Sequence, residues 1–124
     1  MISATFDGAE REFRIRREHV PYLERAMGRP LYAILRDFTA GEWRFDDVAA
    51  IVSFALHGPA PSDRQAMAFA RQAAHYGVTL RASYAPHRNV VAVLERDGHG
   101  NFASLAADIL TDTIFGDTKE ASDA

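Results

Sequence analysis

The sequence contains no cysteine among its 124 residues, and this absence excludes several kinds of site. A disulfide framework, a thiolate zinc site and a cysteine nucleophile all require thiols. The apolar run within residues 45–58 is shorter than the ~20 residues that a membrane-spanning helix needs. Residues 1–10 lack the basic region and apolar run of a secretory signal. We therefore expect a cytoplasmic protein that does not bind a membrane.

Lysine is nearly absent as well, since Lys119 is the only lysine among 14 basic residues. The formal net charge is −3. This mild acidity argues against a protein that binds nucleic acid through bulk charge. The length is typical of one domain with a real apolar core.

Motifs that carry catalysis are also missing. The sequence contains neither GxxxxGK[ST], GxGxxG, GxSxG nor HExxH. The adjacent carboxylates Asp46 and Asp47 fit the first turn of a helix better than acid–base catalysis, because neighbouring helix residues point in different directions. No two of the five histidines have the spacing of a helical metal site; they are His19, His57, His75, His87 and His99. We predict that the protein is not an enzyme and holds no metal or cofactor.

What the sequence does contain is a helix that is apolar on nearly every side. Residues 45–57 leave little polar surface between Asp46, Asp47 and His57. Such a helix must be covered on several sides by the rest of the chain. Gly58 suits its end. We expect this helix to lie at the centre of the domain.

Residues 2–15 predict a β-hairpin, with strands at about 2–6 and 9–15. Asp7 and Gly8 are the residues that a two-residue type I′ turn prefers. This turn pairs Phe6 with Ala9 and Ile2 with Phe13. The open edges of such a hairpin are surfaces where another chain could join.

The remaining patterns predict a mostly α (α+β) fold, in which the hairpin packs on a bundle of five to six short helices. Residues 1–116 are expected to form one domain, and the polar residues 117–124 a disordered tail. Residues 78–96 allow two interpretations: a loop followed by a helix, which we favour, or a second hairpin turning at 85–88. The expected helices are about 18–27, 30–40, 45–57, 62–76, 87–96 and 101–115, with Asn101 as the cap of the last.

Charged and aromatic residues give the candidate binding sites. Arg14 and Arg16 belong to a basic patch beside the hairpin, which either forms ion pairs with nearby glutamates or binds an acidic partner or a phosphate backbone. Trp43 is either a lid on the core or an exposed anchor for a partner. A helix-turn-helix reading through residues 62–76 is the weaker alternative, because that segment carries few side chains suited to DNA.

The order of motifs in residues 22–58 and 102–116 resembles a tail protein family encoded in alphaproteobacterial gene transfer agents and related prophages. In that family a Leu-Glu pair and a Gly-Arg-Pro-Leu segment precede a glycine–aromatic turn and an apolar helix. Residues 59–100 are longer than is usual for the family. The matching positions are Leu23, Glu24, Gly28, Arg29, Pro30, Leu31, Leu35, Gly41, Val48, Ile51, Leu56, Gly58, Leu110, Phe115 and Gly116.

The resemblance implies a non-catalytic protein of phage-like tail morphogenesis. One version is a tail assembly chaperone that binds the tape-measure protein. The other is a structural tail tube or connector subunit that self-associates within the particle, and a small helical DNA-binding regulator is a weaker alternative. A partner surface is expected near Tyr32, Arg36 and Trp43, or at Arg14 and Arg16 beside the hairpin. No nucleic acid or membrane is expected as a partner.

Overall fold

The computed structural model describes residues 1–59, 64–65, 68, 71–72, 75–77 and 86–116. The chain starts with an antiparallel hairpin of β1 (Ile2–Phe6) and β2 (Ala9–Phe13). The helices that follow in order are η1 (Arg17–His19), α1 (Val20–Met27), α2 (Leu31–Thr39), α3 (Phe45–His57), α5 (Arg88–Asp97), η2 (His99–Phe102) and α6 (Ala103–Phe115), where η marks a 3-10 helix.

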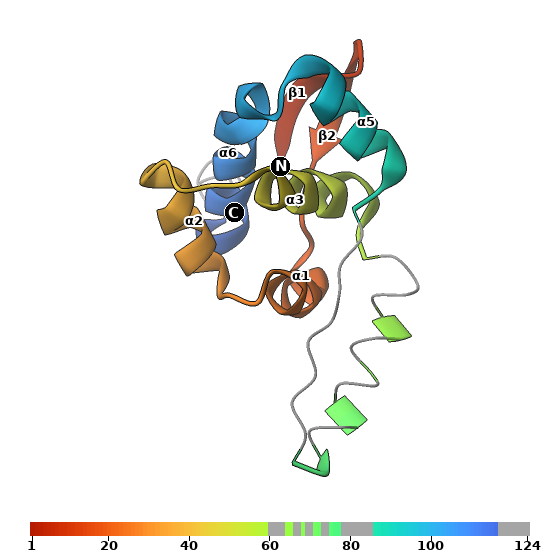
Figure 1. Cartoon of the computed structure of the whole chain (residues 1–124), viewed down its shortest axis with the longest axis vertical. Coiled ribbons are helices and arrows are strands. Elements are labelled where there is room, and N and C mark those ends of the chain that lie inside the picture. Colours follow the sequence, from red (N-terminus) through yellow and green to blue (C-terminus); the bar gives the residue numbers. More distant parts are fainter. Residues whose placement is uncertain (60–63, 66–67, 69–70, 73–74, 78–85, 117–124) are drawn as a thin grey trace.

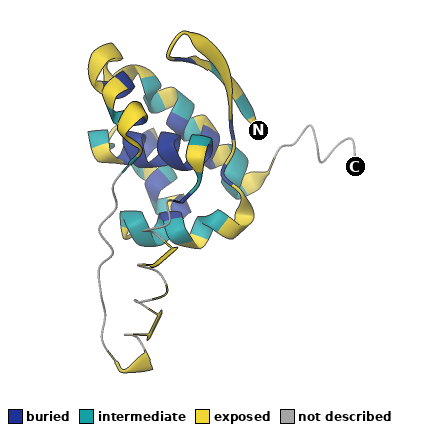
Figure 2. Cartoon of the chain, turned by 90° about the vertical axis from the view of Figure 1, so that its right-hand side faces the viewer, coloured by how far each residue is buried: buried dark blue, intermediate teal, exposed yellow. Residues whose placement is uncertain are grey.

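The α3 helix lies at the centre of this arrangement, as predicted (Figure 1). It contacts α1, α5, α6, η2 and strand β2, whereas α2 packs against α6. All residues from Asp47 to Ala55 are buried. Figure 2 shows the buried residues gathered in the middle of the molecule. A helix with no exposed face in this stretch can form only when other elements cover it on several sides.

The hairpin has the predicted register. Phe6 pairs with Ala9, Ala4 with Arg11 and Ile2 with Phe13. Asp7 and Gly8 both have positive φ, at 54° and 77°, as a type I′ turn requires. The Phe6 ring makes edge-to-face contacts with Phe13 and Phe102, with ring centroids 6.0 and 5.5 Å apart. These contacts anchor the apolar face of the hairpin on the helical core.

Several boundaries differ from the sequence predictions. Strand β2 ends at Phe13, which pairs with Ile2 at the start of β1, rather than at residue 15. The N–H of the next residue, Arg14, donates to the Ala55 carbonyl of α3 at 3.3 Å. The expected helix at 18–27 begins as the 3-10 helix η1 and becomes α1 at Val20.

The start of the last helix also differs. Asn101 does not cap it, since its side-chain amide instead donates to the Asp97 carbonyl at 2.8 Å and closes the end of α5. The chain passes through η2 before α6 begins at Ala103.

For residues 78–96 the sequence allowed either a loop and a helix or a second hairpin. The structure confirms the helix. Helix α5 begins one residue later than expected, after the N-cap residue His87. The Nδ1 atom of His87 accepts a hydrogen bond from the Asn89 N–H at 3.2 Å. The preceding loop, most of the predicted helix at 62–76 and the tail at 117–124 lie outside the described residues.

The central position of α3 gives a prediction about stability. Ile51 is fully buried, and its truncation (Ile51→Ala) leaves a cavity that the surrounding helices cannot fill. We expect the free energy of unfolding to fall by about 2 to 5 kcal/mol. Leu56→Ala removes a half-buried side chain from the same helix and should have a smaller effect. Urea denaturation of both variants measures the difference, and equal losses would contradict a fully covered α3.

Candidate partner-binding surfaces

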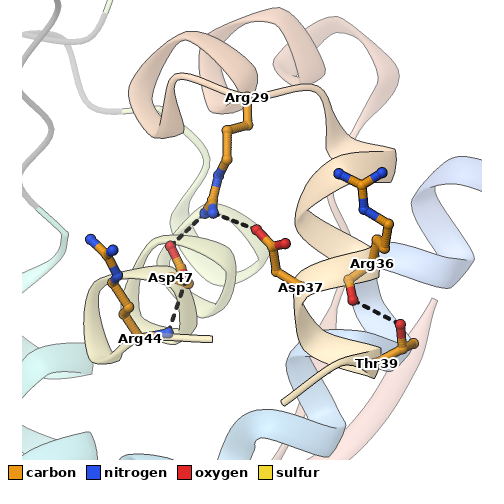
Figure 3. A network of polar contacts seen from close by, with 6 residues as sticks. All are labelled: Arg29, Arg36, Asp37, Thr39, Arg44 and Asp47. Atoms are coloured by element: carbon orange, nitrogen blue, oxygen red, sulfur yellow. Dashed lines mark hydrogen bonds and ion pairs between the residues drawn. The ribbon is translucent and has the colours of Figure 1, made fainter. Parts of the chain in front are cut away.

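Three helices meet at Arg29, which lies in the turn between α1 and α2. Its guanidinium binds Asp37 of α2 at 2.6 Å and Asp47 of α3 at 2.7 Å (Figure 3). Glu24 of α1 supports the same turn, since its Oε2 accepts from the Leu31 N–H at 2.8 Å. Arg29 thus fixes the position of α2 relative to α3.

Of the two carboxylates expected in a capping role, Asp47 has it. One of its oxygens binds Arg29, and the other accepts from the Arg44 N–H at 3.0 Å. The side chain is almost completely buried, whereas the adjacent Asp46 is exposed. A buried carboxylate is stable only when its oxygens find such partners.

The first predicted surface, Tyr32, Arg36 and Trp43, is only partly exposed. Tyr32 and Arg36 are four residues apart on α2 and both face solvent; 63% of Tyr32 is exposed. Trp43 is half-buried instead. Its ring stacks on Phe38 at a centroid distance of 6.4 Å and meets the edge of His99 at 5.6 Å. These two contacts are those expected of a Trp43 ring that lies as a lid on the core.

The second predicted surface, Arg14 and Arg16, lies at the other end of α3. Both arginines are exposed and line a hollow of about 400 Å³ with Glu12, His19 and residues 54–58. Arg16 is 3.9 Å from Glu18, and such a long ion pair between two exposed side chains contributes little to stability. Helix α3 is 13 residues and therefore about 20 Å long; Arg14 contacts it near its end at Ala55, whereas Trp43 precedes its start. The five predicted residues thus form two separate surfaces.

Sequence patterns gave no sign of a histidine pair that the fold brings together. The His57 and His87 rings stack with centroids 3.9 Å apart and an interplanar angle of 22°. Burial lowers the pKa of His57, and the neighbouring His87 and Arg11 lower it further. Burial also lowers the pKa of His19, which lies against Gly58. The fold therefore favours the neutral forms of His57 and His19.

Among the residues that the structure describes, no three histidines or carboxylates are grouped as a metal site would require. The same residues include no helix that is long and apolar enough to cross a membrane. What the geometry offers is exposed side chains and strand edges suited to contact with another macromolecule.

A family model described as "phage tail tube protein, GTA-gp10" matches residues 1–116. The chain therefore belongs to this phage tail family, as the resemblance in residues 22–58 and 102–116 predicted. No curated protein and no solved structure matches the chain.

Removing the Asp47 carboxylate tests the junction of the three helices. We expect Asp47→Ala to lower the free energy of unfolding by about 2 to 3 kcal/mol, because Arg29 and the Arg44 N–H both lose an acceptor. Asp46→Ala removes the same charge from an exposed position and should cost less than about 1 kcal/mol. Chemical denaturation measures both values, and similar losses would contradict the proposed role of Asp47.

The histidine stack predicts a pH dependence. The folded state disfavours protonation of His57, so the unfolded state binds more protons below the ordinary pKa of 6.5. The contribution of neutral His57 to the free energy of unfolding is therefore fully present above about pH 6.5 and is lost as the pH falls. Urea denaturation between about pH 8 and pH 5 should show a smaller acid loss in His57→Gln than in the wild type. Coincident pH profiles would show that His57 does not contribute.

Proposed function

We propose that this member of the phage tail family is a non-catalytic tail assembly chaperone that binds the tape-measure protein. The observation that carries the proposal is the exposed pair Tyr32 and Arg36 on α2, a helix that Arg29 ties to α3 through Asp37 and Asp47. Tyrosine and arginine are enriched among the residues that dominate binding energy at protein interfaces. A rigid helix presents them at a low entropic cost.

The sheet content supports this choice over a tube subunit. Within the described residues the sheet has two strands. The wall of a closed β-structure needs continuous pairing between many strands. A chaperone needs only a surface that a helical partner can cover while tube subunits assemble. The protein would act in the bacterial cytoplasm without a cofactor.

The alternative is a structural subunit that stays in the finished tail. The description of the matching family as a tail tube protein favours it. An open edge of the hairpin is also a surface where a strand of another subunit could join. Mass spectrometry of purified particles distinguishes the two functions. Many copies per particle would support the structural subunit and contradict the chaperone.

Co-expression with the tape-measure protein tests the chaperone directly. The wild-type chain should form a complex and keep the tape measure soluble. We expect the double variant Tyr32→Ala, Arg36→Ala to weaken the complex by about 30-fold or more, since each side chain is a candidate hot spot. The variant Tyr76→Ala, Arg88→Ala changes exposed residues of the same types elsewhere and is the matched control.

Affinity can be measured by calorimetry with a soluble tape-measure fragment. Equal binding by the two double variants would show that α2 is not the contact surface. A tape measure that is equally soluble without this chain, and forms no complex with it, would overturn the chaperone function itself.

A further inference from the structure

The outer edge of β2 has backbone groups that the hairpin does not use. Phe6 and Ala9 flank a two-residue turn and therefore form a hydrogen-bonded pair, as do Ala4 and Arg11 two positions on. In an antiparallel ladder the residues between such pairs direct their N–H and C=O groups away from the partner strand. Those residues on β2 are Glu10 and Glu12, and both are exposed.

The surrounding structure limits this open edge to a short stretch. Arg14 is the next residue whose backbone points outward, and its N–H already donates to the Ala55 carbonyl at the end of α3. The opposite strand differs, because β1 contacts α6 and the terminal amine of Met1 beside it binds Asp112 of α6 at 2.6 Å. An added strand therefore fits best beside Glu10–Glu12.

The hairpin is held in place at both ends of β2. At the turn, Asp7 binds Arg96 of α5 at 3.0 Å. At the exit, the Arg14–Ala55 hydrogen bond ties the strand to α3. An edge that is fixed before binding loses little conformational entropy when a partner pairs with it.

The charges on the open edge indicate which kind of strand it accepts. Glu10 and Glu12 lie on the same face, and they occupy both of the outward-pairing positions. A second copy of β2 confined to this stretch would place glutamate opposite glutamate, which is destabilising. A strand with arginine or lysine at alternate positions would place a cation opposite each carboxylate.

We propose that the β2 edge binds an extended basic segment of another tail protein by strand addition. Backbone hydrogen bonds to Glu10 and Glu12 supply the register, and the two carboxylates select basic residues at positions i and i+2. This contact goes beyond the proposed chaperone function, because it requires neither Tyr32 nor Arg36 and does not depend on a helical partner.

Synthetic peptides of about seven residues test the proposal with the full chain. One peptide alternates arginine with valine, and a second has glutamate in place of arginine. The arginine peptide should bind about tenfold more tightly in fluorescence titrations, and the preference should reverse in Glu10→Arg, Glu12→Arg. The matched control Glu95→Arg, Asp108→Arg changes the net charge equally at exposed positions and should keep the wild-type preference.

Backbone pairing is tested by N-methylation of the arginine peptide. Methyl groups on the amides that face β2 should abolish binding, whereas methyl groups on the alternate amides should leave it intact. Binding should also slow hydrogen exchange of the Glu10 and Glu12 amides. Failure of the arginine peptide to bind, indifference to the methylation pattern, or an equal effect of the control variant would overturn strand addition. Dimerisation of the chain through this edge, detected by sedimentation, would overturn the choice of partner.

Discussion

The almost complete burial of α3 is the constraint on which the rest of the structure depends. A helix with apolar residues on every side must be covered by several elements, and the hairpin, α1, α5 and α6 supply that cover. The two buried polar side chains of α3 each bind a residue of a covering segment. Asp47 binds Arg29, which lies between α1 and α2, and Ser53 accepts from the His87 N–H at the start of α5 at 2.9 Å. A buried polar group must be paired, so each one fixes where a covering element begins.

Sequence patterns were sufficient wherever the determinants are local. The limits of α3 follow from its apolar run, its first-turn aspartates and Gly58. The hairpin register follows from Asp7-Gly8 and the alternation of Ile2, Ala4 and Phe6. Both depend on residues within a few positions of each other.

The contacts that the sequence patterns did not predict connect residues far apart in the chain. Arg29 and Asp47 are 18 residues apart, and Ser53 and His87 are 34 residues apart. Neither spacing corresponds to a helical or strand period, so no local pattern predicts them. The hollow lined by Arg14 and Arg16 could not be predicted for the same reason, because its other walls come from residues 54–58 of the distant α3 segment. Asn101 was expected to cap a helix, but the Asp97 carbonyl offered its amide a competing partner.

The burial of α3 also determines how much of the hairpin is available for binding. The C-terminal turn of α3 reaches the strand at Arg14 and uses the outward-facing amide there, so the open edge of β2 ends at Glu12. A short edge with two like charges is poorly suited to pairing with itself, which protects the free chain from aggregation. The same two charges make the edge selective. A basic strand is attracted at both positions, whereas a second copy of β2 is repelled at both. Protection and recognition thus depend on the same pair of carboxylates. The open edge is limited to these two carboxylates because the Arg14–Ala55 hydrogen bond holds the next residue against α3.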